Sequence, residues 1–419
     1  MSALTTYTHA LKQLQRDVRI YLFTAVLAGF ATSGVYSVLL NIFLLRLGYN
    51  STFIGWVNAA GQFAFITISF LAGWLSLRLG TRRLILTGLA CYGLGYFLLP
   101  LAEFFPAPYQ SVWLLGAAML ASFGGPLYWV NGNLFMMDKT TEVERTHAYS
   151  LRTGFFPLSG FVGSLVGGWM PSFFAQNFGY SLDDPAPYRF ALMLGAVLFV
   201  PAFWMMAQTT DSRIATKKEL EEQTEPFPWA LFVLLAIIML VRAAGEMAAR
   251  SFYNVYLDSV FGVPVSSIGL IASAGLFLAI PTALITPTLT DRWGNANVFL
   301  VSMIGMGASL GMMGLFTQWW LVGISYVLLM IFAAATKPTI YVYRLAILSP
   351  VWWGAMSGTG GTTHGIGMAG GAIGGGYLID SIGYQNFFLM SAVIVVAGAM
   401  GFWFYNQQYP EQKQTSEVS

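Results

Sequence analysis

The sequence predicts an all-α membrane protein with twelve transmembrane helices in two pseudo-symmetric six-helix halves. Hydrophobic residues make up 56% of the 419-residue chain and charged residues only 9%, whereas an ordinary soluble domain is about 25% charged. Twelve apolar runs are long enough to cross a bilayer as helices, which takes roughly 20 residues each. Short motifs also recur between the two halves. A soluble fold is excluded, because so few charges could not provide a solvated surface.

The predicted spans follow one another with short connections, and proline within a span is tolerated in membrane helices. Their approximate ranges are 20–46, 52–77, 84–103, 111–136, 147–172, 188–208, 229–257, 266–289, 297–316, 318–342, 353–378 and 384–406. The longest polar connection separates the sixth span from the seventh. We therefore expect an N-terminal segment 1–19, a six-helix half 20–208, a linker 209–228, a second six-helix half 229–406 and a tail 407–419.

The basic residues set the orientation, since cytoplasmic loops carry an excess of Lys and Arg. If the N-terminus is cytoplasmic, Arg46 and Arg189 are the only basic residues left in the outer loops. We therefore expect both termini in the cytoplasm of a multi-pass protein of the bacterial cytoplasmic (inner) membrane. Arg152, at the start of the fifth span, is interpreted as one of these topology residues.

The chain contains an internal duplication. The segment Asn41-Ile42-Phe43-Leu44 matches Asn254-Val255-Tyr256-Leu257 at an offset of 213 residues, and Gly48 matches Gly262 at an offset of 214. The loop that follows the second span matches the loop after the eighth at the same offset. Two such repeats predict a substrate site at their interface near the bilayer midplane, with alternating access by rocking of one half on the other.

The loops after the second and eighth spans resemble the G-x-x-x-D-R-x-G-R-R/K signature of the major facilitator superfamily. The matching residues are Gly73, Arg78, Gly80, Arg82, Asp291, Arg292 and Gly294. Leu77 replaces the acidic residue of the first copy, and Pro287 replaces the first glycine of the second. The resemblance covers essentially the whole chain and implies a fold of major-facilitator type. It also implies that these residues form a cytoplasmic gate, which latches the cytoplasmic ends of the halves together in the outward-facing state. Alternatively, the basic residues only fix topology.

Three charges lie inside the seventh span, at Arg242, Glu246 and Arg250. Residues at i, i+4 and i+8 differ by about 40° around a helix and about 6 Å along it, so all three share one face. That face must look into the bundle or a wet cavity, because a charge facing lipid costs several kcal/mol. The duplicate positions in the first span hold Gly29, Ser33 and Ser37. The charge therefore belongs to one half only.

Two interpretations of this ladder stay open. In the first, Glu246 bridges Arg242 and Arg250 in a self-contained ion-pair network that has no part in transport, as in many buried ion pairs. In the second, the net positive charge, increased by Lys337, binds an anionic substrate or a substrate carboxylate, for which an arginine fork is well suited. Glu246 is then either an orienting partner or the proton-coupling carboxylate. Proton coupling would need an arginine to be withdrawn in one state, for instance by substrate.

Further candidates for substrate binding or coupling are polar residues within other spans. They are Lys337, His364, Tyr36, Asn41 and Asn131. Each has a simpler alternative: Lys337 could extend its amine to the membrane surface, and the others could hydrogen-bond between helices.

The sequence thus favours a secondary active transporter of a small organic solute, anionic or amphipathic, coupled to a proton or another ion and acting as a monomer in the lipid bilayer. The alternatives are a polyspecific drug or lipid exporter and, remotely, an intramembrane enzyme. An enzyme is disfavoured, since there is no H-E-x-x-H motif and only one deep carboxylate. We expect no catalytic residues, no cofactor and no metal; Cys91 is the only cysteine, which excludes a cysteine-rich metal site. The net charge of +2 gives no indication of nucleic-acid binding.

Overall fold

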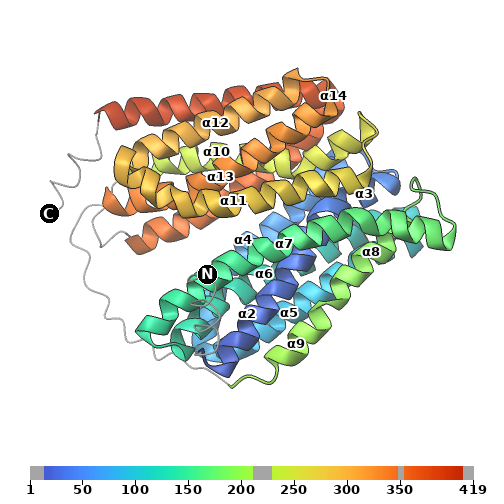
Figure 1. The fold of residues 1–419 in the computed structure, drawn as a ribbon, viewed down its shortest axis with the longest axis horizontal. Helices are drawn as coiled ribbons and strands as arrows, with labels where there is room; N and C mark the ends of the chain where they lie inside the picture. Colours follow the sequence, from blue (N-terminus) through green and yellow to red (C-terminus); the bar gives the residue numbers. More distant parts are fainter. Residues whose placement is uncertain (1–13, 211–228, 348–352, 409–419) are drawn as a thin grey trace, which may run out of the picture. The chain divides into compact units, whose positions relative to one another are not determined.

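The computed structural model describes residues 14–210, 229–347 and 353–408, and every regular element in these ranges is a helix (Figure 1). The prediction of an all-α fold is therefore confirmed. Three predicted segments lie largely or wholly outside the described residues: 1–19, 209–228 and 407–419.

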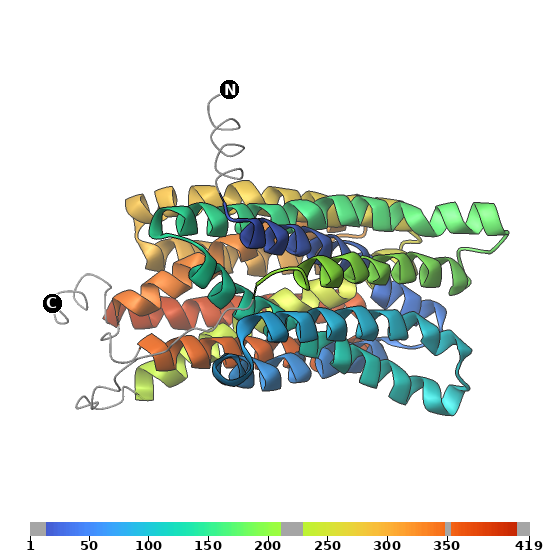
Figure 2. The same cartoon turned by 90° about the horizontal axis from the view of Figure 1, so that it is seen from below.

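The described residues form two compact units. Unit 1 comprises the described residues of 1–47 and 63–218, and unit 2 those of 48–62 and 219–419. Within each unit the long helices run roughly alongside one another (Figure 2). Segment 48–62 belongs to the first predicted half but to unit 2. The division of the chain into two six-helix halves stays a prediction.

Unit 1 holds the first six predicted spans, apart from the beginning of the second. Its elements are α2 (Arg16–Gly29), η1 (Phe30–Tyr36), α3 (Ser37–Arg46), the later part of α4 (Ser51–Leu79), α5 (Thr81–Leu98), η2 (Leu99–Phe104), α6 (Ala107–Lys139), α7 (Glu142–Phe178), α8 (Ala186–Val197) and α9 (Phe199–Met206). The first predicted span consists of α2, η1 and α3 in succession, and the sixth of α8 and α9. A helix therefore lies at each predicted position.

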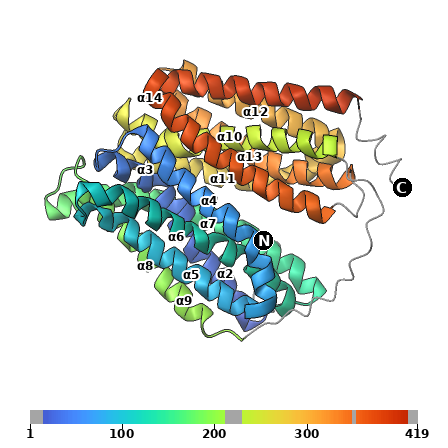
Figure 3. The same cartoon turned by 180° about the vertical axis from the view of Figure 1, so that it is seen from behind.

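Unit 2 holds the remaining spans and the first turns of α4. Its other elements are α10 (Trp229–Ser259), α11 (Val265–Trp293), α12 (Asn295–Leu315), α13 (Trp319–Ala346) and α14 (Trp353–Gln408). α14 contains both the eleventh and the twelfth predicted spans. Gly383, with φ 81° and ψ 166°, interrupts the helical backbone between them. The two arms of α14 fold back on each other (Figure 3). Ten segments of the described residues are long and apolar enough to cross a membrane.

The backbone repeats the duplication seen in the sequence. Every described residue with positive φ is a glycine, and these are Gly48, Gly80, Gly179, Gly262, Gly294 and Gly383. The first three follow spans one, two and five; the last three follow spans seven, eight and eleven. Only glycine adopts this conformation without steric cost. The same turns therefore occur at corresponding places in both repeats, which supports their pseudo-symmetry.

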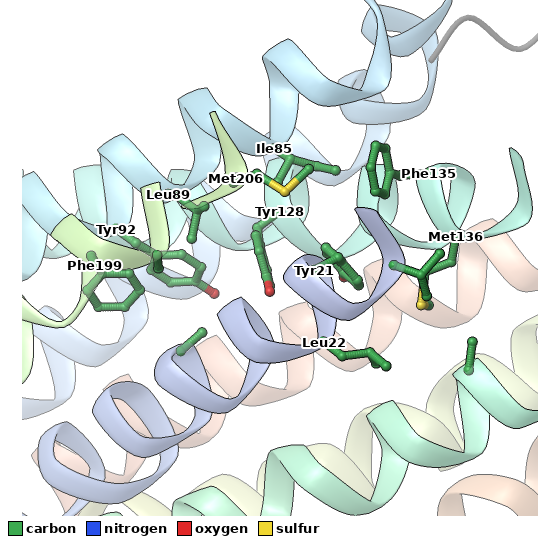
Figure 4. Packing of buried hydrophobic residues seen from close by; sticks show 14 of the residues in the cluster. Tyr21, Leu22, Ile85, Leu89, Tyr92, Tyr128, Phe135, Met136, Phe199 and Met206 are labelled. Carbon is green, nitrogen blue, oxygen red and sulfur yellow. The ribbon is translucent and has the colours of Figure 1, made fainter. Parts of the chain in front are cut away.

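Aromatic side chains from α2, α5, α6 and α9 form the core of unit 1 (Figure 4). Tyr21 of α2 stacks on Tyr128 of α6, with ring centroids 5.4 Å apart. The Tyr128 hydroxyl lies 2.8 Å from Oγ1 of Thr24. Where no side chain intervenes, helices approach closely: a Cβ on Gly88 would lie 2.8 Å from the backbone nitrogen of Tyr128. Close packing through small residues is the usual means of joining helices in lipid.

In unit 2, α10 packs along α14, and the first turns of α4 are bonded to α14. The backbone N–H and the hydroxyl of Thr52 donate to Oδ2 of Asp380, at 2.9 and 2.6 Å. Two turns later, Ala59 packs in a cluster with Met247 and Ala372. A carboxylate at a helix N-terminus is stabilised by the helix dipole. These contacts explain why residues 48–62 belong to unit 2.

Candidate functional site

A cluster of charged side chains lies in unit 2, where α10, α13 and α14 meet. Glu246 is at its centre and is 1% exposed. Its Oε2 lies 2.9 Å from Nη1 of Arg242. Its Oε1 lies 2.9 Å from Nε of Arg250 and 3.2 Å from Nζ of Lys337. One carboxylate therefore contacts three cations, all of which were candidates from the sequence.

The regular geometry of α10 brings together three of the four charged residues of this cluster. Arg242, Glu246 and Arg250 follow one another at intervals of four residues, so each side chain reaches the next along one face. Lys337 comes from α13 and reaches the same carboxylate oxygen as Arg250. The structure thus brings Lys337 to Glu246.

Arg242 is fixed by two further contacts from neighbouring helices. Its Nη1 donates to Oγ1 of Thr336 at 3.2 Å, and its Nη2 lies 2.9 Å from Nδ1 of His364. A guanidinium has donors only. Nδ1 of His364 must therefore accept this hydrogen bond, so the neutral ring carries its proton on Nε2. Arg242 itself is 1% exposed, which makes it the buried anchor of the cluster.

Exposure divides the cations of the cluster into two kinds. The side chain of Arg242 is 1% exposed, whereas those of Arg250 and Lys337 are 35% and 52% exposed. With His364 neutral, one negative charge faces three positive charges. The excess positive charge is therefore concentrated on Arg250 and Lys337, the two partly exposed side chains. This arrangement can bind an added anion.

The other candidates from the sequence lie in unit 1 and do not join this cluster. The Tyr36 hydroxyl donates to the main-chain oxygens of Tyr96 and Leu192, at 2.6 and 2.9 Å. Nδ2 of Asn131 donates to its own helix, to the oxygen of Leu127 at 2.9 Å. Asn41 is 5% exposed. The contacts of Tyr36 and Asn131 are those of helix packing.

The predicted gate residues fall at two helix junctions, α4 to α5 and α11 to α12. Gly80 and Gly294 precede α5 and α12 with φ of 82° and 78°, which only glycine adopts readily. Arg82 donates to the main-chain oxygen of Ala207, at the end of α9 in unit 1. The remaining gate residues lie in α4 and near the end of α11: Gly73, Arg78, Asp291 and Arg292. Their role as a gate stays a prediction.

Sequence reasoning missed Thr336 as a member of the cluster. It is fully buried and directly precedes Lys337. Adjacent residues on a helix point about 100° apart, so no periodic pattern pairs it with Arg242. The stacked rings of Tyr253 and Tyr326, with centroids 3.7 Å apart, were also not singled out. Within the described residues no group of His, Cys, Asp and Glu side chains could hold a metal ion.

Among characterised and curated proteins, the chain is 26% identical over 219 residues to "Multidrug resistance protein MdtH" of Baumannia cicadellinicola subsp. Homalodisca coagulata, covering 49% of this chain and 51% of that protein. It thus spans about half the length of this relative. It is 24% identical to "Quinolone resistance protein NorA" of Staphylococcus aureus (strain MRSA252), covering 59% of this chain and 60% of that one. An uncharacterised transporter, YceJ of Bacillus subtilis (strain 168), is 24% identical, with 69% and 71% covered.

Two solved structures show the same fold. The nucleoside transporter NupG superposes with a TM-score of 0.69 at 16% identity, covering 93% of this chain and 99% of that one. A bacterial homologue of the human lysosomal transporter Spinster gives a TM-score of 0.72 at 15% identity, covering 95% and 97%. At this identity the likeness concerns the fold alone.

The family profile described as "Major Facilitator Superfamily" matches residues 21–242 and 235–419, which together cover nearly the whole chain. This match agrees with the motifs of the two loops and with the all-helical fold. The resemblance predicted from the sequence is therefore confirmed. The chain belongs to the Major Facilitator Superfamily.

Proposed function

We propose that this protein is a secondary active transporter of a small organic solute with an anionic group, and that the charged cluster of unit 2 binds that group. Transport is by alternating access, the mode expected of two six-helix repeats. The observation that carries the proposal is the imbalance of the cluster. A single carboxylate, Glu246, faces three cations, and two of them are partly exposed.

The substrate anion takes over cations that Glu246 contacts in this structure. Lys337 and Arg250 both contact Oε1, at 3.2 and 2.9 Å, so an arriving anion competes for the same side of the carboxylate. Arg242 contacts Oε2 and stays buried. Glu246 therefore orients the cations before binding. Withdrawal of Lys337 and Arg250 by the substrate would also free Oε1 for a proton, which gives a route to proton coupling.

The cellular setting follows from the loops. The distribution of Lys and Arg supports an orientation with both termini in the cytoplasm. We propose that the protein works as a monomer in the bacterial cytoplasmic membrane.

A second candidate function is polyspecific drug export. It is favoured by the names of two relatives, which are a multidrug resistance protein and a quinolone resistance protein. The two candidates differ in what they require of the substrate. The first requires an anionic group, whereas polyspecific export requires apolar bulk and tolerates different charges.

The test is flux into proteoliposomes with matched solutes that differ only in charge: carboxylates, the corresponding carboxamides and the corresponding amines. Each is measured with and without a pH gradient, for the wild type and for Lys337→Met. The matched control is Arg189→Gln, which removes a cation from the 2.7 Å Arg189–Glu103 ion pair of unit 1.

We expect transport of carboxylates over carboxamides, reduced by about tenfold or more in Lys337→Met, since a hydrogen bond to a charged group contributes about 1.5–3 kcal/mol. Arg189→Gln should transport normally. Equal transport of all three charge types would support polyspecific export instead. Carboxylate transport that is unchanged in Lys337→Met would reject the cluster as the binding site.

A further inference from the structure

Unit 1 contains a cavity of about 420 Å³ between α6 and α7. Its size lies within the range of about 300–1,000 Å³ that is usual for sites of small organic molecules. Aromatic side chains form much of its lining, with Trp129 from α6 and Tyr149 and Phe156 from α7. Arg152 and Asn133 supply the polar part. The cavity thus combines flat apolar walls with one cation.

Contacts with uncharged groups hold Arg152 in this cavity. Its Nη1 donates to Oδ1 of Asn133. Its guanidinium carbon lies 4.7 Å from the centre of the Trp129 ring and 5.7 Å from that of Tyr21. Among the carboxylates whose side chains the structure describes, none forms an ion pair with Arg152. A half-buried cation without a counter-charge is a site that an anion stabilises.

The walls around Arg152 are fixed by contacts of their own. Trp129 meets Phe156 edge to face, with ring centroids 4.7 Å apart and an interplanar angle of 89°. The Tyr149 hydroxyl donates to the main-chain oxygen of Asn133 at 2.9 Å. Asn133 therefore anchors both Tyr149 and Arg152. Preorganisation of this kind lowers the entropic cost of binding a ligand.

We propose that this cavity binds an organic anion with a flat apolar part, such as an aromatic carboxylate. The five N–H donors of the guanidinium are not used up by the bond to Asn133, and the remaining edge matches the two oxygens of a carboxylate or phosphate. The apolar part lies against Trp129 and Phe156. The same chemistry, an anionic group next to apolar carbon, is offered by a free solute and by an anionic lipid headgroup.

This site is formed by residues of unit 1 alone, whereas the charged cluster belongs to unit 2, and the proposal does not depend on the function proposed for that cluster. Arg152 and Lys337 lie on different units and share no contact partner. Binding here is therefore measured directly, rather than through transport. The topological role of Arg152 is compatible with the proposal, because a basic residue near the membrane surface can serve both purposes.

The experiment is calorimetric titration of the purified full-length protein in detergent with 2-naphthoate and, for comparison, its neutral analogue 2-naphthamide. The variants are Arg152→Gln and Arg152→Lys, and the matched control is Arg83→Gln, at an exposed arginine of α5. Each is also measured together with Lys337→Met, which removes a cation from the unit 2 cluster. Size-exclusion profiles and thermal midpoints show whether each variant is folded.

We expect naphthoate to bind more tightly than naphthamide and Arg152→Gln to weaken naphthoate binding by about tenfold or more. Arg152→Lys keeps the charge and should retain part of the binding, while Arg83→Gln should bind like the wild type. The Lys337→Met background should leave the effect of Arg152→Gln on naphthoate binding unchanged. Wild-type affinity in Arg152→Gln, or equal affinity for naphthamide, would overturn the proposal.

Nanodiscs separate the two sources of the anion. If discs of phosphatidylglycerol suppress naphthoate binding while discs of phosphatidylcholine do not, an anionic lipid headgroup occupies the cavity. If naphthoate binds equally in both, the occupant is a free solute. Either result supports the site, and only the dependence on Arg152 and on ligand charge decides whether it exists.

Discussion

Replacing Glu246 by glutamine tests the electrostatics of the charged cluster most severely. The substitution keeps the size of the side chain and removes its charge. Arg242, Arg250 and Lys337 would then surround a neutral amide at the 2.9 to 3.2 Å now separating them from the carboxylate. The cations would repel one another without compensation, so the folded protein should be destabilised.

The magnitude follows from burial. Removing one partner of a buried ion pair typically costs about 3–5 kcal/mol. Two unit charges 4 Å apart interact by about 4 kcal/mol at an effective dielectric constant of 20. Arg250 and Lys337 are 35% and 52% exposed, whereas Arg242 is 1% exposed, so most of the cost arises at Arg242. We therefore expect a loss near the lower end, about 3 kcal/mol.

The assay is chemical denaturation of the detergent-solubilised protein, from which the free energy of unfolding is obtained. The control is Glu103→Gln: its ion pair with Arg189 is more exposed, at 23% for Glu103, and should contribute about 1 kcal/mol or less. Adding Arg242→Met to Glu246→Gln should restore part of the stability, because it removes the uncompensated buried charge. If Glu246→Gln were as stable as the wild type, the reasoning would be refuted.

Three further predictions concern single sites. His364→Leu should lower the free energy of unfolding by about 1–3 kcal/mol, since it leaves an N–H of the buried Arg242 guanidinium unsatisfied. His364→Asn keeps an acceptor and should be less destabilising. Denaturation curves of the two variants test this, and equal stability of the two would contradict it. Gly294→Ala forces alanine to a φ of 78° and should lower the free energy of unfolding by about 1–2 kcal/mol. Gly116→Ala, in open space on α6, should be neutral or stabilising. Equal thermal midpoints of the two variants would contradict this. The backbone N–H of Thr141 donates to Glu144 at 3.0 Å, and this bond, the largest cause, lowers the pKa of Glu144 below its ordinary value. The stabilisation is present above the unfolded pKa of Glu144 and is lost as pH falls through its folded pKa. Hydrogen exchange in the first turn of α7, corrected for intrinsic rates, should therefore increase as pH falls through that range. Exchange that does not respond to acid would contradict this prediction.

Much of the fold could be predicted because local rules determine it. Each apolar run is long enough to predict a membrane-spanning helix. Gly48 and Gly262, which match at an offset of 214 residues in the sequence, both have positive φ. The division into units was harder to predict. Residues 48–62 belong to unit 2 because Thr52 bonds to Asp380, a contact between segments far apart in the sequence.

The candidate site was predictable where it lies on one helix. The four-residue spacing of Arg242, Glu246 and Arg250 was enough to place them on one face. That Lys337 contacts Glu246, rather than reaching the membrane surface, depends on how α13 packs against α10. The cavity at Arg152 was missed for a similar reason: its residues have helical spacing on α7 and on α6, but that these two faces meet depends on how the helices pack. Contacts between helices carry the information that a single sequence lacks.

The central claim is that the cluster of unit 2 binds an anionic group of the substrate. Its most direct test is the ratio of dissociation constants for a carboxylate solute, chosen from the flux panel, and its carboxamide, measured on the purified protein. We predict that the wild type prefers the carboxylate by about tenfold or more and that Lys337→Met loses most of this preference, while Arg189→Gln keeps it. A preference that survives unchanged in Lys337→Met would contradict the account.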